Sequence, residues 1–334
     1  MSKVPAWQQL AEVGSLGALR VMNVVYRGFG RRVVVAALYP IVAYFYLRHR
    51  RVRDASRDYL TALAAAADGP LPRRRDVFRH LFEFGVQIFD RTVSWGDSFD
   101  RMELEKSRSI ALLELARTGR GGILVGAHLG SFDLLRLVAD RYEVRVNVLM
   151  FTAHADRINA FFARLDPRSR VRVLPIDPDS VQTAFAVRRC VEQGEFVGIL
   201  ADRVPPGGRG RTQRVPFLGR EAAFPTAPFE LAALLGCPLL LCLCLRTGDA
   251  RYEALALPLY EGGRLAPGGR AARARELLEA YVRELEARCR RAPYQWFNFY
   301  DFWALREEGD GAQGRTAPAL DLHGEGDHPE VSRG

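Results

Sequence analysis

The stretch GILVGAHLGSFD, residues 122–133, joins an apolar run to a turn and the start of a helix. Gly122 to Ala127 have the length and composition of a buried strand. Gly130 and Ser131 can turn the chain, and Ser131 is a suitable N-cap for a helix over SFDLLRLVADRY. The stretch therefore predicts a strand, a tight turn and a helix in succession.

The same stretch contains an imidazole and a carboxylate, His128 and Asp133. On one continuous helix a separation of five positions would turn the two side chains to different faces. With His128 at the strand end and Asp133 in the first helical turn, both can face one site, and the helix dipole favours the anion there. A lone histidine more often has a structural role, so the hypothesis of a His128–Asp133 catalytic pair depends on its context.

From Gly122 onward, short apolar runs alternate with amphipathic segments. This alternation predicts an α/β fold with a mostly parallel central sheet flanked by helices. Expected strands are ILVGA, VRVNVLM, VRVLPI, EFVGILA, QRVPFLG, PLLLCLCLRTG and YEALALPL. Expected helices are SFDLLRLVADRY, HADRINAFFARL, SVQTAFAVRRCVEQG, APFELAALLG and RAARARELLEAYVRELEARCRRAP.

The first 120 residues are expected to be mostly helical, including the segment MELEKSRSIALLELARTGRGG. We divide the chain into an N-terminal helical membrane-associating region over residues 1–66, an α/β domain over 67–306 and a tail over 307–334. The tail is rich in glycine and charge, which is typical of disorder.

The apolar segment VVVAALYPIVAYFYL, residues 33–47, has arginines on both sides. As a helix it would span about 22 Å, whereas the hydrocarbon core of a bilayer is about 30 Å thick. Because both flanks are basic, the charge asymmetry of a single span is missing. We expect a segment that lies in or dips into the cytoplasmic leaflet, with a kink at Pro40. A short tilted span and a buried core helix are the alternatives, and no signal-peptide cleavage site follows the first apolar stretch.

The chain has a net charge of +9, and nearly all of its basic residues are arginine. Such a balance suits an anionic partner, either a membrane surface, an acidic carrier protein or nucleic acid, although genomic composition bias is an alternative cause. No nucleic-acid-reading motif is present. The five cysteines lack paired C-x-x-C spacing, so we expect buried thiols and no metal site.

A second candidate position is Asp202, in GILADRVPPGGRGRTQR. Like His128, it follows an expected strand, and ligands in open α/β sheets bind at the carboxyl ends of strands. Arg203 adjoins it, and more arginines follow in the Gly/Pro-rich loop. These arginines are suited to hold a phosphate or sugar headgroup, and the alternative is a solvated basic loop.

Several motifs in order along the chain resemble one family. AHLGSFD is similar to an H-x4-(D/E) motif, and GILADR followed by RVPFLGREAAFPTAPFELAALLGCPLL is similar to a second, Asp-containing strand end with its following turn and helix. The N-terminal segments WQQLAEVGSLGALRVMNVVYRGFGRR and AYFYLRHRRVRDASRDYL and the closing segment YQWFNFYDFW complete the series. Over roughly residues 5–305 the chain resembles the lipid A biosynthesis acyltransferases of the lysophospholipid acyltransferase superfamily.

Three features of the sequence concern the acceptor. Family members that acylate lipid A usually have Asn-Trp-Glu where this chain has Ser131, Phe132 and Asp133. The FNFYDFW ending is similar to members in pathways for aryl polyene or other unusual outer-membrane lipids. The FPTAP segment at 224–228 lacks the FPEGTR-like phosphate motif of glycerolipid acyltransferases, which use acyl-CoA. The acceptor therefore stays open between a lipid A precursor-like molecule and another outer-membrane glycolipid or aryl polyene lipid.

The resemblance implies transfer of an acyl group from an acyl carrier protein thioester, or from acyl-CoA, to a hydroxyl of a membrane lipid at the cytoplasmic face of the bacterial inner membrane. His128 would act as general base, oriented by Asp133, and no cofactor is implied. Residues expected to stabilise the oxyanion or bind substrate are Gly130, Ser131, Arg164 (with Arg157 as a competitor for its role), Asp202 and Arg203. A Ser-His-Asp hydrolase is disfavoured because G-x-S-x-G is absent from the sequence. A catalytically inactive scaffold of the same fold is the remaining alternative.

Overall fold

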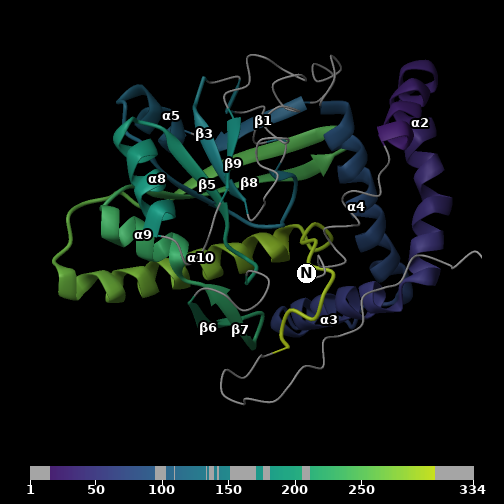
Figure 1. The fold of residues 1–334 in the computed structure, drawn as a ribbon. Helices are drawn as coiled ribbons and strands as arrows, with labels where there is room; N and C mark the ends of the chain where they lie inside the picture. The colour runs from purple at the N-terminus through teal and green to yellow at the C-terminus, as the bar shows by residue number, and fades with distance from the viewer. Residues whose placement is uncertain are drawn as a thin grey trace, which may run out of the picture.

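The computed structural model describes residues 16–94, 103–108, 110–132, 134, 139–140, 143–150, 171–175, 181–204 and 211–304. A central sheet is covered by helices on both faces, and a group of N-terminal helices lies along one side (Figure 1). The helix HADRINAFFARL, most of SFDLLRLVADRY and the tail over 307–334 were expected in parts of the chain that lie outside the described residues.

The central sheet contains seven described strands. β1 and β9 run opposite to the other five, and all neighbours except β8 and β9 are parallel. The mostly parallel α/β sheet predicted from the sequence is therefore confirmed. In spatial order the strands are β1 (Glu103–Arg108), β9 (Arg251–Tyr260), β8 (Leu239–Gly248), β2 (Gly122–Gly126), β5 (Phe196–Leu200), β3 (Val146–Met150) and β4 (Val171–Pro175).

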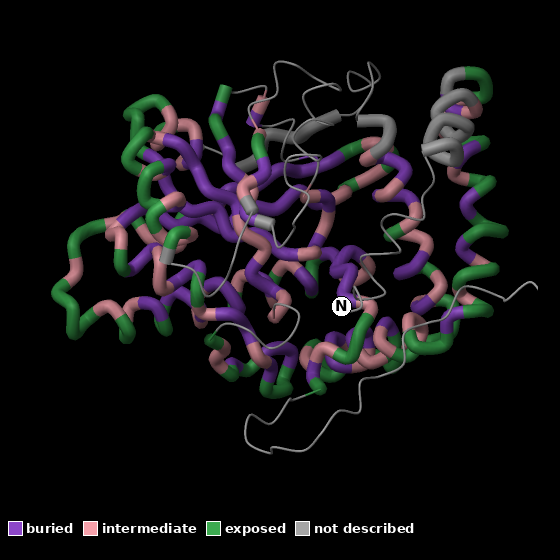
Figure 2. Tube along the Cα trace, viewed as in Figure 1, coloured by how far each residue is buried: buried purple, intermediate pink, exposed green. Residues whose placement is uncertain are grey.

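Alternate residues of the strands pack on opposite faces of the sheet, as the period of a strand requires. Ile123 and Val125 belong to the larger core cluster, whereas Leu124 belongs to a smaller cluster on the other face. The sheet is buried along most of its length (Figure 2). The helices around it are α5 (Ile110–Arg117), α8 (Val181–Glu192), α9 (Ala227–Leu235) and α10 (Arg270–Arg291), the last preceded by the short 3-10 turn Pro267–Gly269.

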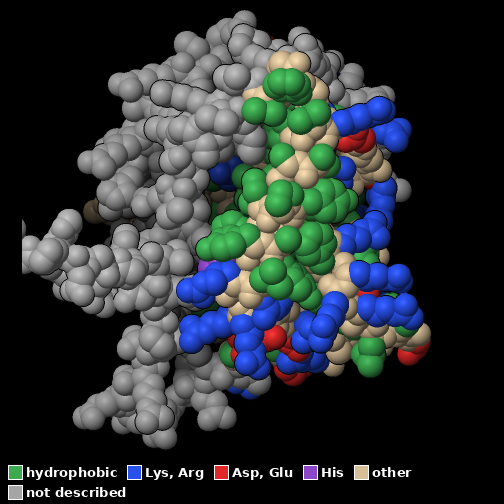
Figure 3. All heavy atoms as spheres, turned by 90° about the vertical axis from the view of Figure 1, so that its right-hand side faces the viewer, with side chains coloured by type: hydrophobic (Ala, Val, Ile, Leu, Met, Phe, Trp, Pro, Cys, Tyr) green, Lys and Arg blue, Asp and Glu red, His purple; other side chains and the backbone are tan. Residues whose placement is uncertain are grey.

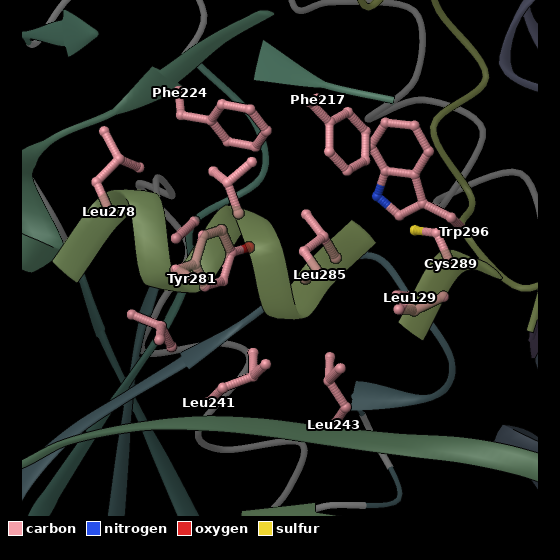
Figure 4. Close-up of a cluster of buried hydrophobic side chains, with 14 of the residues drawn as sticks. Leu129, Phe217, Phe224, Leu241, Leu243, Leu278, Tyr281, Leu285, Cys289 and Trp296 are labelled. Carbon is pink, nitrogen blue, oxygen red and sulfur yellow. The ribbon is translucent and has the colours of Figure 1, made fainter. Parts of the chain in front are cut away.

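α10 covers the face that contains the larger core cluster. Leu278, Tyr281 and Leu285 of this helix belong to that cluster together with Leu241 and Leu243 of β8 (Figure 4). The Tyr281 hydroxyl also donates a hydrogen bond to the carbonyl of Gly126 at the end of β2. The long final helix predicted from the sequence thus braces the strand that precedes His128.

A separate two-stranded hairpin consists of β6 (Thr212–Phe217) and β7 (Arg220–Pro225). Its two-residue turn, Leu218–Gly219, has positive φ at both positions, which matches the twist of a hairpin. β6 was predicted, but β7 was missed, because REAAFP is short and has no β-branched residue. Phe217 and Phe224 of the hairpin extend the core on the side of α10 that faces away from β8 (Figure 4).

The prediction of a helix beginning at MELEKSR was wrong, since Glu103–Arg108 forms the edge strand β1. This segment has no apolar stripe of its own, and its backbone pairs with β9, nearly 150 positions later in the chain. A partner so distant in sequence gives no local signal, so tertiary pairing overrides the local preference. The helix α5 begins only at Ile110.

The N-terminal region is helical, as expected, with α2 (Leu16–Arg48), α3 (Arg50–Ala66) and α4 (Arg74–Ser94). The expected kink at Pro40 is not where helical geometry breaks. The break is at Gly30, whose φ of 78° and ψ of 175° suit only a residue without a Cβ. Pro40 lies inside the second, longer helical part.

One face of α2 packs against α4, and the other face exposes its side chains in the described part of the structure. Val34 and Leu38 share a buried cluster with Phe89 of α4, and Arg31 forms an ion pair with the buried Asp90. The outer face exposes large apolar side chains, which form a continuous strip in Figure 3. Gly28–Arg48 has the length and hydropathy of a membrane span, and it is mostly exposed, which disfavours a buried core helix.

Candidate active site

His128 and Asp202 occupy matching positions beyond two neighbouring strands. β2 and β5 are parallel and pair up to Gly126 and Leu200, and the N–H of Ala201 donates to the Gly126 carbonyl. Each candidate residue comes two positions after its strand ends. The carboxyl edge of the sheet therefore brings together two side chains that are 74 positions apart.

The carboxylate of Asp202 holds His128 at two points. Oδ1 lies 2.8 Å from the ring Nδ1, and Oδ2 accepts the backbone N–H of His128 at 2.9 Å. Asp202 is completely buried, whereas 27% of the His128 side chain is exposed. The His128 ring is therefore fixed on its Nδ1 side, where Asp202 lies, and is partly accessible to solvent elsewhere.

The charge on Asp202 fixes the tautomer of the imidazole. Burial favours the neutral acid, but the His128 ring and the Arg203 guanidinium outweigh it and lower the pKa of Asp202 to about 2. An ionised carboxylate only accepts hydrogen bonds, so Nδ1 must donate its proton to it. In the neutral ring the lone pair then lies on Nε2, and within the described ranges no group binds that atom.

Two further donors reach Asp202 from the part of the closing segment that spans Gln295–Asn298, which is called the closing segment below. The indole N–H of Trp296 donates to Oδ2 at 2.9 Å, and the Nδ2 of Asn298 donates to the same oxygen at 3.2 Å. Both side chains are buried. Asp202 thus accepts four hydrogen bonds from the described part of the chain, which accounts for a stable anion in the core.

The loop after His128 is fixed between this segment and β8. Leu129 pairs with Trp296, and the N–H of Phe297 donates to the His128 carbonyl. The N–H groups of Gly130 and Ser131 donate to the carbonyls of Gln295 and Cys244, respectively. Because both N–H groups are already bonded, an oxyanion donor from this loop has to come from another group.

Gly130 is required by this close approach. Its φ is +74°, and a Cβ at this position would lie 2.1 Å from the Cys244 carbonyl oxygen. A second hydrogen-bond network, around the Gln295 side chain, holds the segment that contacts this loop. The Gln295 side chain accepts from the backbone N–H of Arg246 and donates to its carbonyl, and Gln87 of α4 donates to the same Gln295 oxygen.

Arg203 points toward the closing segment. Its Nε donates to Asn298 Oδ1 at 2.5 Å, and one terminal nitrogen donates to the Phe297 carbonyl at 2.8 Å. Burial lowers the pKa of Arg203. These bonds give the residue a structural role beside Asp202, and its predicted contact with a substrate stays a prediction.

Two of the predicted site residues, Asp133 and Arg164, lie outside the described residues, as does the competitor Arg157. The described residues contain no group of three or more His, Cys, Asp or Glu that would hold a metal ion. All five cysteines are buried and free, as predicted.

Sequence reasoning did not assign the residues that surround the His128–Asp202 pair. Trp296 and Asn298 were seen only as part of a Trp-rich ending, and His80 was not singled out. His80 is fully buried on α4, with Ser56 at its Nδ1 (2.9 Å) and the Trp296 carbonyl at its Nε2 (3.0 Å). His80 is a polar residue within the apolar stripe of a predicted helix, and this pattern is the signal that could have identified it from the sequence.

A carboxylate-bound histidine with an accessible second nitrogen, set at the carboxyl edge of a parallel sheet, is suited to general-base catalysis. The model of the bacterial lipid A biosynthesis acyltransferases matches residues 100–304, which include every residue placed in this site except His80, Ser56 and Gln87. The chain belongs to this acyltransferase family. A comparison with curated proteins gives no match.

Proposed function

We propose that this protein transfers a fatty acyl group from an acyl carrier protein thioester to a hydroxyl of a membrane lipid, with His128 as the general base. The observation that supports this most strongly is the bond between His128 Nδ1 and the buried carboxylate of Asp202. Family membership supports acyl transfer to a lipid. The base, the donor and the acceptor are parts of the proposal.

In the proposed reaction His128 Nε2 takes the proton of the acceptor hydroxyl as its oxygen attacks the thioester carbonyl carbon. Collapse of the tetrahedral intermediate breaks the C–S bond and leaves an ester. The proton on Nε2 then passes to the departing thiolate, so the free thiol of the carrier is the second product. No enzyme nucleophile is needed, because the thioester is already activated.

Asp202 fills the orienting role that the sequence pattern suggested for Asp133. One carboxylate at Nδ1 is sufficient to fix the tautomer and stabilise the imidazolium, and a second carboxylate on Nε2 would block the base. We therefore assign the orienting role to Asp202. Asp133 is retained as a proposed site residue that contacts the substrate, and Arg164 as one that contacts the substrate or the oxyanion.

The exposed face of α2 supports a position in the membrane interface. Phe29, Tyr44 and Leu47 are 73%, 62% and 75% exposed. Arg48 ends α2 and Arg50 begins α3, where both side chains would meet lipid phosphates. Because the other face of α2 packs on a domain with charged surfaces, we propose that the helix lies in the cytoplasmic leaflet of the inner membrane and does not cross it.

This arrangement keeps the predicted division into a membrane-associating region over 1–66, an acyltransferase domain over 67–306 and a tail over 307–334 as a proposal. The acceptor would be a lipid A precursor-like molecule or another outer-membrane glycolipid or aryl polyene lipid. An acidic carrier protein would be attracted by the net charge of +9.

A transfer assay with the purified protein tests the proposal. The protein is incubated with total lipids from a Gram-negative inner membrane and with a radiolabelled acyl chain on either acyl carrier protein or coenzyme A. We expect label in an ester-linked lipid only with active protein, and a higher kcat/KM for the carrier protein than for coenzyme A. Preference for acyl-CoA with a glycerolipid acceptor would favour a glycerolipid acyltransferase, and no transfer from either donor would favour the inactive scaffold.

A further inference from the structure

We propose that Trp296 and Asn298 are positioning residues, which hold the Asp202 carboxylate in the one orientation that keeps the His128 ring ready to act as a base. The inference rests on the proposed function of the His128–Asp202 pair. It extends the site to the closing segment of the chain, more than 90 positions after Asp202.

The hydrogen bonds divide unequally between the two carboxylate oxygens. Among the described residues, Oδ2 accepts three donors, from the His128 backbone, Trp296 and Asn298, whereas Oδ1 accepts the ring Nδ1–H alone. Rotation of the carboxylate about its Cβ–Cγ bond would break all three bonds at Oδ2. The two oxygens of an ionised carboxylate are equivalent, so what the donors at Oδ2 fix is the plane of the carboxylate and the position of the oxygen that faces the ring.

The indole of Trp296 is itself held in place on several sides. Its ring centroid lies 4.9 Å from Tyr59, 5.2 Å from Phe217 and 4.7 Å from Phe302, in each case edge to face. Figure 4 shows the indole between Phe217 and Cys289. The backbone carbonyl of Trp296 is also bonded to His80. The indole N–H thus reaches Asp202 with little freedom to turn away.

The amide of Asn298 is oriented by a different neighbour. Arg203 Nε has only a proton to donate, so the Asn298 oxygen must face Arg203 and its NH2 group must face Asp202. Trp296 and Asn298 come from one segment, and the same segment pairs with the His128 loop. Both members of the catalytic pair therefore depend on it for their position.

Nuclear magnetic resonance of the ring nitrogens tests this inference without an activity assay. The full chain is labelled with 15N-histidine in detergent micelles, and the His128 signals are assigned by their loss in His128→Ala. At high pH we expect wild-type His128 to be the Nδ1–H tautomer. In Trp296→Phe/Asn298→Leu we expect the two nitrogen shifts to move toward an average of the two tautomers.

Kinetics give the second readout. We expect the double variant to lower kcat by about 10- to 100-fold, by analogy with the residues that orient metal-binding histidines, with KM within about twofold of wild type. Asn298→Leu alone gives a smaller change in the same direction, and this single variant tests the inference if the double variant does not fold.

Trp303→Phe is the matched control. Trp303 lies in the same aromatic cluster, but within the described part of the chain its buried Nε1 has no hydrogen-bond partner. We expect wild-type shifts and kcat for this variant. The inference is overturned if the double and single variants keep the wild-type tautomer and kcat, or if Trp303→Phe lowers kcat equally. A wild-type ring in the Nε2–H form would instead contradict the His128–Asp202 assignment itself.

Discussion

His128 Nδ1 lies 2.8 Å from Asp202 Oδ1, because the two residues stand at matching positions beyond neighbouring parallel strands. The pair is rigid on the Asp202 side, where the carboxylate is buried, and open on the His128 side. A base that must meet a lipid hydroxyl needs this asymmetry, because its tautomer has to be fixed while its reactive nitrogen remains accessible.

Asp202→Asn is expected to lower kcat/KM for acyl transfer by about 10³-fold or more, because an amide NH2 at the position of Oδ1 would impose the wrong tautomer on the ring. The measurement is steady-state transfer with the carrier-bound donor. Asp58→Asn is a suitable control, since Asp58 forms an exposed ion pair with Arg220. Activity within threefold of wild type in Asp202→Asn would contradict the orienting role.

Asp133→Asn is expected to leave the Nδ1–H tautomer of His128 unchanged, because Asp202 is the carboxylate that accepts this proton. The 15N shifts of the ring measure this independently of any loss of turnover. A change to the Nε2–H form in Asp133→Asn would restore the orienting role to Asp133.

The buried His80 predicts a loss of stability in mild acid. Its burial lowers its pKa to about 4, from an ordinary value of about 6.5 in the unfolded chain. Between these values the unfolded chain binds a proton that the folded protein does not. The stability is therefore fully present above about pH 6.5 and decreases by roughly 3 kcal/mol as the pH falls to 4.

Urea unfolding at pH 7, 6, 5 and 4 measures this slope. In His80→Gln the free energy of unfolding should change less over this range, even if the variant is less stable throughout. Asp202 contributes little to the slope, and only near pH 4, because its pKa of about 2 keeps it ionised in the folded protein and its ordinary value lies just below the range. An equal slope in His80→Gln would show that His80 does not titrate as described.

Gly130→Ala is expected to destabilise the protein by several kcal/mol and to abolish transfer, because the new methyl group would overlap the Cys244 carbonyl. Gly219→Ala separates this clash from backbone strain. Gly219 has nearly the same φ, +75°, but open space around its Cβ position, so we expect a loss of only about 1–2 kcal/mol. Equal losses of stability in the two variants would contradict the close approach at Gly130.

Tyr44→Ser/Leu47→Ser is expected to weaken binding to vesicles of phosphatidylethanolamine and phosphatidylglycerol by at least about tenfold, because both exposed side chains would be buried in lipid. Co-sedimentation measures the binding. Phe185→Ser on α8 is the control, since Phe185 is 63% exposed but lies on a helix that packs against the sheet and not on α2. Unchanged binding in the α2 variant would remove the support for the interfacial position.

The strands and helices with strong local patterns were predictable from sequence. The runs that became β2, β5 and β8 are almost purely apolar, and α10 has a clear helical stripe. β1 was not predictable, because its charged residues pair with a strand distant in the chain. The same limit applies to the site. His128 and Asp202 were both correctly predicted at strand ends, but their pairing was not predicted.

The pairing of His128 with Asp202 needs the order of the strands as well as their ends. β3 and β4 lie between β2 and β5 in sequence, yet β2 and β5 are neighbours in the sheet. No local pattern gives this adjacency, so the sequence predicted only Asp133 as the orienting carboxylate, and this residue lies outside the described part of the chain. The positioning residues Trp296 and Asn298 depend in turn on the return of the chain after α10.

The central claim, acyl transfer with His128 as base, is tested most directly by mass spectrometry of lipid extracts from cells. Three strains are compared, with the wild-type protein, with His128→Ala at equal abundance and without the protein. We predict a membrane lipid that is lighter by one acyl group in both deficient strains, and this lipid identifies the acceptor. Identical lipids in the wild-type and His128→Ala strains would contradict the claim and favour an inactive scaffold.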